Sequence, residues 1–296
     1  MPVPDSEDDG PGGWAGFRIG AALGIALLAG FVGGRVTAPS PSQPAAQDAP
    51  TPGSAFFVSD APLHQHGGVA TTDTAGLTRT AAGLTLTTET TAFTPGRRSP
   101  FRFRIVARGG AAVTTYTTAH ERLLHLIVIR RDLTGFQHLH PTMAPDGTWS
   151  TDLALAAPGS YRAIADFTAV VGGGPVPVAL GVDLTVTGDH RPTPLPAPAS
   201  PVETDDLTVR LDGWTVAVTG ADGSPASLEP YLGASGHLVS FREGDVAYQH
   251  THAKPDSPPG AARFQVAPPA PGRYRVFAEF QVAGKVHVAA FTVAVS

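Results

Sequence analysis

Hydrophobic and polar residues alternate in short runs along most of the chain beyond residue 76. The segments 101–107 (FRFRIVA), 207–211 (LTVRL) and 214–220 (WTVAVTG) show the period of two that is typical of strands with one buried face. Gly and Pro, 34 and 29 of the 296 residues, separate these runs and indicate turns. Several short strands within about a hundred residues are typical of an immunoglobulin-like sandwich. We therefore expect an all-β fold.

One apolar run has the length of a membrane span. Residues 17–36 (FRIGAALGIALLAGFVGGRV) reach the roughly 20 residues that cross a hydrocarbon core. The preceding residues are acidic rather than basic, and no small-x-small cleavage pattern follows, so a signal anchor is favoured over a cleaved signal peptide. One arginine lies on each side of the run, so charge sets no orientation and the outward placement is an inference. We expect a single-pass protein of the cell membrane, with residues 1–16 as a short acidic cytoplasmic tail and the C-terminal domains extracytoplasmic.

Two stretches rich in Pro and Ala divide the rest of the chain. Residues 37–75 are expected to form a semi-extended tether, because their composition cannot bury a core. Residues 191–204 form a second, Pro-rich linker. We therefore expect two tandem immunoglobulin-like β-sandwich domains, at 76–190 and 205–296, preceded by one N-terminal transmembrane helix.

The two expected domains repeat one pattern of histidines. HLIVIRRDLTGFQHLH at 125–140 corresponds to HLVSFREGDVAYQHTH at 237–252, and both read His-x12-His-x-His. Downstream, GSYRAIADF at 159–167 corresponds to GRYRVFAEF at 272–280. The chain is therefore an internal duplication that keeps three histidines in each copy.

Each copy of the motif is expected to be an antiparallel hairpin. The turn positions place His125 opposite His140, Ile127 opposite His138, and His237 opposite His252. Because alternate residues of a strand share a face, all three imidazoles of a copy lie on one side. That side is otherwise apolar, so we expect it to face the core and to hold the imidazoles at the rim of the sandwich.

Converging imidazoles suit Zn²⁺ or Cu²⁺. The expected metal ligands are the six histidines of the two motifs: His125, His138, His140, His237, His250 and His252. Weaker candidates are two carboxylates at matching places, Asp166 and Glu279, and a further His-x-His pair, His64 and His66. The alternative is that the histidines are structural and satisfy buried carbonyl groups.

Composition excludes several classes of function. A net charge of −5 with no basic cluster argues against nucleic acid as a partner. The absence of cysteine excludes disulfides, thiolate nucleophiles, iron–sulfur clusters and a lipoprotein anchor. Met1 and Met143 are the only methionines, so a Met-rich Cu(I) relay is excluded. An enzyme is not favoured, because a cupin-like site needs a Glu soon after the histidine pair and residues 141–145 contain none.

The segments LHLIVIRRDLTGFQHLHP with PGSYRAIADF, and GHLVSFREGDVAYQHTH with PGRYRVFAEF, resemble uncharacterised envelope proteins of high-GC Gram-positive bacteria. They are more loosely similar to YtkA-type immunoglobulin-like modules and to copper-handling cupredoxin-like proteins. The resemblance implies an extracytoplasmic β-sandwich that handles copper or another heavy metal. Ala253 stands where the first copy has Pro141, which departs from the usual His-x-His-Pro.

Taken together, these features predict a membrane-tethered extracytoplasmic protein that buffers, delivers or senses Cu(II) or Zn(II), with one site in each module. Its expected partners are the membrane, through residues 17–36, a metal ion and an envelope metal-handling protein. The alternative is a structural or interaction protein of the cell envelope that binds no metal.

Overall fold

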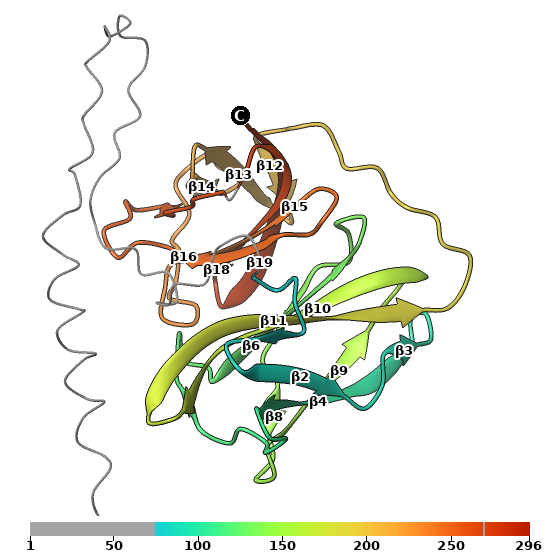
Figure 1. Cartoon of the computed structure of the whole chain (residues 1–296). Coiled ribbons are helices and arrows are strands. Elements are labelled where there is room, and N and C mark those ends of the chain that lie inside the picture. Colours follow the sequence, from blue (N-terminus) through green and yellow to red (C-terminus); the bar gives the residue numbers. More distant parts are fainter. Residues whose placement is uncertain (1–74, 269) are drawn as a thin grey trace, which may run out of the picture. The chain divides into compact units, whose positions relative to one another are not determined.

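The computed structural model describes residues 75–268 and 270–296 (Figure 1). The expected tail, the anchor at 17–36 and His64 and His66 of the tether lie outside these residues. In the described part, no helix is long and apolar enough to cross a membrane.

The described residues form strands and turns, which confirms the all-β prediction. The strands are β1 (Thr80–Ala81), β2 (Leu84–Thr88), β3 (Ala92–Phe93), β4 (Arg98–Ala107), β5 (Tyr116–Thr117), β6 (Leu124–Arg130), β7 (Gln137–Leu139), β8 (Thr142–Met143), β9 (Thr148–Ala154), β10 (Gly159–Val171), β11 (Gly174–Val186), β12 (Val202–Thr204), β13 (Leu207–Asp212), β14 (Thr215–Thr219), β15 (His237–Arg242), β16 (Tyr248–His252), β17 (Ala261–Arg263), β18 (Gly272–Val282) and β19 (Lys285–Val295). We call β1 to β11 the first module and β12 to β19 the second module.

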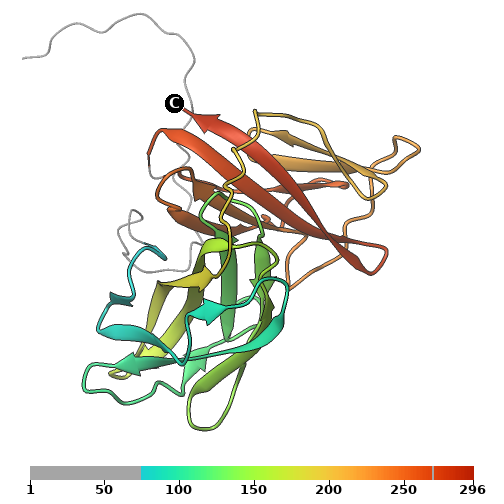
Figure 2. The same cartoon turned by 90° about the vertical axis from the view of Figure 1, so that its right-hand side faces the viewer.

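Two sheets pack around one core in the first module (Figure 2). Their strand orders are β1-β2-β4-β9-β8 and β3-β11-β10-β6-β7, with β5 paired to β10. Phe101, Phe103 and Trp149 come from the first sheet and Tyr161 and Phe167 from the second, and all five are buried in the shared core. The two alternating faces predicted from sequence therefore meet as a sandwich.

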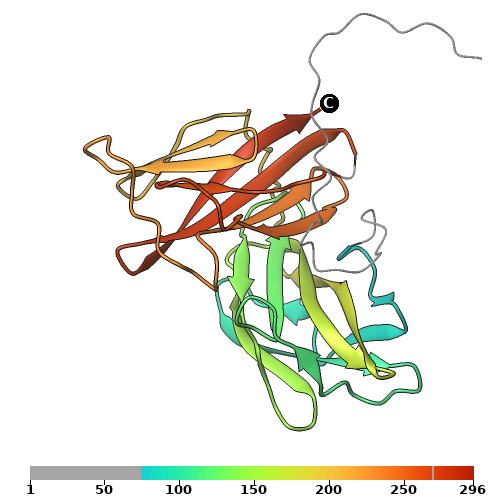
Figure 3. The same cartoon turned by 90° about the vertical axis from the view of Figure 1, so that its left-hand side faces the viewer.

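The second module repeats this arrangement (Figure 3). Its sheets have the orders β12-β13-β14-β17 and β16-β15-β18-β19. Val209 and Val218 from one sheet pack in a common core with Val276, Phe280 and Phe291 from the other. Corresponding strands β6 and β15 occupy the same position, between the hairpin partner and the long strand that follows.

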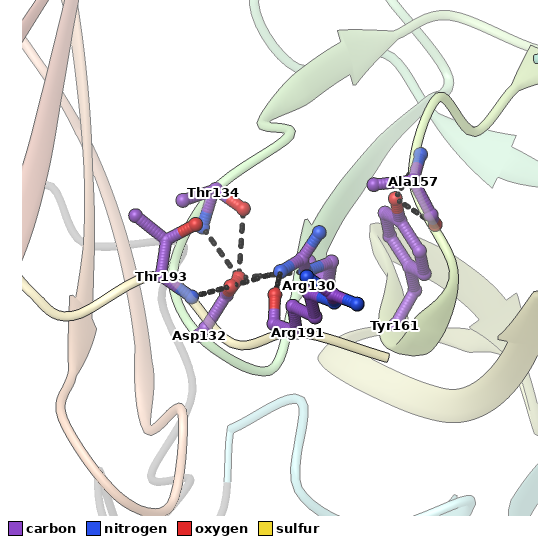
Figure 4. A network of polar contacts seen from close by, with 7 residues as sticks. All are labelled: Arg130, Asp132, Thr134, Ala157, Tyr161, Arg191 and Thr193. Atoms are coloured by element: carbon purple, nitrogen blue, oxygen red, sulfur yellow. Dashed lines mark hydrogen bonds and ion pairs between the residues drawn. The ribbon is translucent and has the colours of Figure 1, made fainter. Parts of the chain in front are cut away.

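A tyrosine near the start of a long strand closes a corner of each module. The Tyr161 hydroxyl donates to the Ala157 carbonyl at 2.9 Å (Figure 4), and the Tyr274 hydroxyl donates to the Ala270 carbonyl at 2.7 Å. This bond is the tyrosine corner of Greek-key sandwiches. It explains why the Pro-Gly-x-Tyr-Arg sequence occurs once in each copy.

Strand β6 is buried on both of its faces. Leu124, Leu126 and Val128 point into the first-module core, whereas Ile127 and Ile129 belong to a separate apolar cluster. We call this the inter-module cluster, because its buried residues come from both modules: Ile127, Ile129, Leu133, Ile164, Val239, Phe241, Val246, Tyr248 and Phe277.

The segment that joins the modules contacts both of them. The Thr193 amide donates to the Asp132 carboxylate at 2.7 Å, and Asp132 also pairs with Arg130 (Figure 4). On the other side, Arg273 donates to the Leu195 carbonyl at 2.9 Å. The joining segment therefore contacts the hairpin of the first module and β18 of the second.

Candidate metal centre

The hairpins that carry the histidines have the expected register. Ile127 pairs with His138 in the first module, and His237 pairs with His252 in the second. Strand β7 ends at Leu139, so His140 directly follows it. The turn position and the strand alternation were therefore sufficient to align the imidazoles.

The expectation that the imidazoles face the sandwich core is wrong. His125 alternates with Leu124 and Leu126, which point into the first-module core, and so it lies on the opposite face with Ile127. In the second module, Leu238 faces the core and Val239 the inter-module cluster. The apolar face that carries the histidines is the face that each module presents to the other.

Each set of three histidines brings its ring nitrogens together. One nitrogen from each of His125, His138 and His140 lies within 4.8 Å of the other two, and the same holds for His237, His250 and His252. We call these sets the first triad and the second triad. The side chains of His138 and His250 have no solvent-exposed area.

Equivalent turns place a backbone carbonyl against the leading histidine of each triad. His125 Nε2 lies 3.2 Å from the Ala119 carbonyl, and His237 Nε2 lies 2.8 Å from the Tyr231 carbonyl, six residues upstream in both cases. The turns have two residues with positive φ, His120 and Glu121 in one and Leu232 and Gly233 in the other. Since a carbonyl only accepts, Nε2 carries the proton in both leading rings, and Nδ1 keeps its lone pair.

The predicted carboxylates lie at the triads and contact the opposite module. Glu279 Oε2, from the second module, is 2.5 Å from His138 Nδ1 of the first triad. Asp166 Oδ2, from the first module, is 3.5 Å from His250 Nδ1 of the second triad and accepts a hydrogen bond from the Tyr248 hydroxyl at 2.9 Å. The sequence alone did not show on which face of their strands Asp166 and Glu279 lie. The strand pairing shows it for Asp166, which pairs with His125 and therefore lies on the same face of the sheet.

Burial keeps three of the imidazoles neutral. Desolvation, with a smaller contribution from the neighbouring His138, lowers the pKa of His125, His140 and His237 to about 3. The Ala119 and Tyr231 carbonyls oppose this shift without reversing it. Neutral imidazole is the form that binds a metal ion.

Two ring nitrogens face each other in the first triad. A carboxylate only accepts, so His138 Nδ1 donates to Glu279. The other nitrogen of that ring, His138 Nε2, lies 2.9 Å from His125 Nδ1, which keeps its lone pair in the neutral ring. Two imidazole ligands of one tetrahedral ion lie about 3.3 Å apart. The two nitrogens are therefore close to the spacing at which they could share one metal ion.

The third ring of the first triad has an unsatisfied nitrogen. His140 Nε2 is buried and makes no hydrogen bond with any described residue. A buried polar atom without a partner costs about 1–3 kcal/mol. A metal ion bound by the triad would remove that cost.

One imidazole beside the second triad, that of His120, has no signal in the histidine motif. The ring of His120 stacks on that of His252, with centroids 3.2 Å apart and planes inclined by 16°. His120 has no histidine counterpart in the second copy, which has Leu232 in its place. Only the turn that both copies share, with its two left-handed residues, could have indicated this position.

Comparison with protein families gives one match. The model of a domain of unknown function (DUF8832) matches residues 79–182 and 204–296, and each of these stretches contains one His-x12-His-x-His motif. The chain belongs to this family. The match does not extend to the YtkA-type and cupredoxin-like specifics that the resemblance implied. A comparison with curated proteins found no match.

Solved structures with a related arrangement are distant. The Escherichia coli adhesin FdeC is 15% identical with a TM-score of 0.26, covering 73% of this chain and 65% of that one. A Corynebacterium diphtheriae protein described as membrane anchored is 10% identical with a TM-score of 0.23, covering 73% and 57%. Fibronectin(III)-like modules of Clostridium thermocellum CbhA are 14% identical with a TM-score of 0.18, covering 71% and 92%. The chain thus spans less than two thirds of the adhesin and of the corynebacterial structure.

Proposed function

We propose that this protein binds Cu(II) or Zn(II) outside the cell membrane through its two histidine triads, and that it buffers, delivers or senses that metal. The observation that carries the proposal is the convergence of the imidazole nitrogens in each triad, with His125 Nδ1 and His138 Nε2 only 2.9 Å apart.

The hydrogen bonds around the triads support metal binding over a structural role. Histidine ligands typically donate their second ring N–H to a carbonyl or a carboxylate, which fixes the tautomer and orients the ring. His125 donates to the Ala119 carbonyl and His237 to the Tyr231 carbonyl, while His138 contacts Glu279. These bonds leave the remaining nitrogens of the rings turned toward one another.

The chemistry of the donors limits the choice of metal. Imidazole and carboxylate suit Zn²⁺ and Cu²⁺, whereas thiolate and thioether ligands that favour Cu(I) are missing from the motifs. A single-pass anchor at 17–36 is supported by its apolar length and would hold the modules on the outer side of the membrane. An envelope metal-handling protein is the partner that such a role requires.

Metal analysis and calorimetry on the purified full-length chain test the proposal. Cu²⁺ or Zn²⁺ should bind and should raise the melting temperature, because a ligand at 100 times its Kd stabilises the folded state by about 2.7 kcal/mol. The variant His138→Ala/His140→Ala/His250→Ala/His252→Ala should lose this binding. The matched control is His190→Ala, which removes an exposed histidine of the same chain.

Two results would contradict metal binding. One is equal metal affinity in the quadruple variant and the His190 control, which would place the metal elsewhere. The other is an unchanged melting temperature of the unmodified chain at metal excess, which needs no variant and would favour the structural role of the histidines.

A further inference from the structure

Members of the two triads lie nearly as close to each other as members of one triad do. Within the triads, the ring centroids of His125 and His138 are 5.2 Å apart, and those of His237 and His250 are 5.7 Å apart. Between the triads, His250 lies 5.2 Å from His125 and 5.2 Å from His138, and His237 lies 6.0 Å from His138. The six imidazoles therefore form one cluster rather than two separate sites.

This cluster also contains two buried carboxylates without a lysine or arginine partner. Asp166 is 6% exposed and Glu279 is 5% exposed. Among the described residues, neither forms an ion pair with a lysine or an arginine, and their polar contacts are imidazoles and the Tyr248 hydroxyl. Burying a carboxylate costs several kcal/mol unless a positive charge compensates it. A cation bound in the cluster would supply that charge.

The contacts between the triads and the carboxylates are reciprocal. Glu279 of the second module holds His138 of the first triad, and Asp166, its equivalent in the repeat, lies by His250 of the second triad. Each module thus supplies three imidazoles and the carboxylate that contacts the other module's triad. The carboxylate that contacts each triad therefore comes from the other module.

We infer that the two triads form a single dinuclear centre between the modules, which binds two Cu(II) or Zn(II) ions as near neighbours. This inference rests on the proposed function and deepens it, because it replaces one site per module with one shared site. Three imidazoles are available to each ion, and the two carboxylates lie where they offset the added charge. Proteins that use paired ions hold them about 3.5–4 Å apart.

The leading histidine of each triad is the most deeply buried. His125 and His237 are 1% and 0% exposed, whereas His140 and His252, which end the two hairpins, are of intermediate exposure.

Copper stoichiometry and electron paramagnetic resonance of the full-length chain test the inference. Loaded with Cu²⁺, the unmodified protein should bind two ions per chain, and its resonance should show dipolar broadening, a half-field signal, or a spin count below the copper content. The variant His250→Ala/His252→Ala should bind one ion and give the full, unbroadened signal of an isolated Cu²⁺. The His190→Ala control should behave as the unmodified chain does.

The results separate this inference from the proposed function. Two ions per chain with full and unbroadened signals would overturn the shared centre but leave metal binding intact. One ion per chain, lost in a variant of either triad, would overturn the two-ion assignment. Failure to bind any copper or zinc would overturn both. The spin count of the unmodified chain decides the question even if a variant does not fold.

Discussion

Glu279 of the second module reaches His138 of the first, with 2.5 Å between the carboxylate Oε2 and the imidazole Nδ1. The two residues are 141 positions apart in the chain. The contact assigns the proton of His138 to Nδ1 and turns Nε2 toward His125. The chemistry of the first triad therefore depends on a residue of the other module.

Replacing Glu279 by glutamine should weaken metal binding. The amide keeps the size of the side chain but removes the charge that polarises His138. Loss of such a supporting group typically costs 10–100-fold in metal affinity. Calorimetric titration with Zn²⁺ checks this against Glu243→Gln, which neutralises an exposed glutamate of the same module. Equal dissociation constants for the two variants would show that Glu279 does not support a ligand.

Truncating Phe277 should destabilise the contact between the modules. Its ring stacks on Phe136 with centroids 4.2 Å apart and planes inclined by 6°, and it is 6% exposed. Phe277→Ala should lower the free energy of unfolding by about 3–5 kcal/mol. Urea denaturation measures the change, with Val288→Ala as the control because Val288 is 40% exposed. A loss no larger than that of the control would mean that the stacked pair adds little.

Adding a methyl group at Gly181 should be poorly tolerated. A Cβ there would lie 1.9 Å from the Gly76 carbonyl oxygen, which accepts a hydrogen bond from Arg162. Gly181→Ala should therefore displace the chain at Gly76 and cost about 1–3 kcal/mol. Gly174→Ala is the matched control, because Gly174 lies on the same strand, β11, and has open space around it. Thermal unfolding of the two variants should differ, and coincident melting curves would refute the clash.

Asp132 should make stability depend on acid pH. Burial alone would raise its pKa, but hydrogen bonds from Thr193, Thr134 and Arg130 lower it below its ordinary value. A carboxyl whose pKa is lower in the folded state contributes its full stabilisation above the unfolded pKa, about 3.9, and loses it as the pH falls through the folded pKa. Asp132→Asn should cost about 1–3 kcal/mol at neutral pH, and this deficit should shrink below about pH 4.

Denaturation of the Asp132 variant at several pH values checks this prediction. The control is Asp152→Asn, which changes an exposed carboxylate of the first module. A deficit that stays constant from neutral pH to pH 3 would contradict the role assigned to the ionised carboxylate.

The register of each hairpin could be predicted because it depends on local information. The turn residues and the period of two align His237 with His252 without reference to the rest of the chain. The face could not be predicted in the same way, since alternation shows which residues share a side but not what covers that side. The apolar run at 123–129 (LLHLIVI) was the available signal, because a strand buried on both faces has apolar residues at odd and even positions.

The contacts between the modules could not be predicted from the alternation of apolar and polar residues. Asp166 and Glu279 were found as equivalents in the repeat, but the exchange of partners depends on how two folded modules meet. The stacking of His120 on His252 is a contact of the same kind, and it joins a turn of one module to a strand end of the other. Such contacts are set by surfaces that form only after each module has folded.

Glu279 and Asp166 make equivalent contacts across the two modules, but they are different residues. Two identical subunits joined at a two-fold contact must make every contact twice, with the same pair of residues at both equivalent places. Covalent fusion removes that constraint. The two halves of this chain differ at several equivalent positions: Asp166 and Glu279, Phe136 and Tyr248, and His120 and Leu232. The two halves of the chain are therefore free to differ, and the two proposed binding positions would hold ions of different affinity or kind.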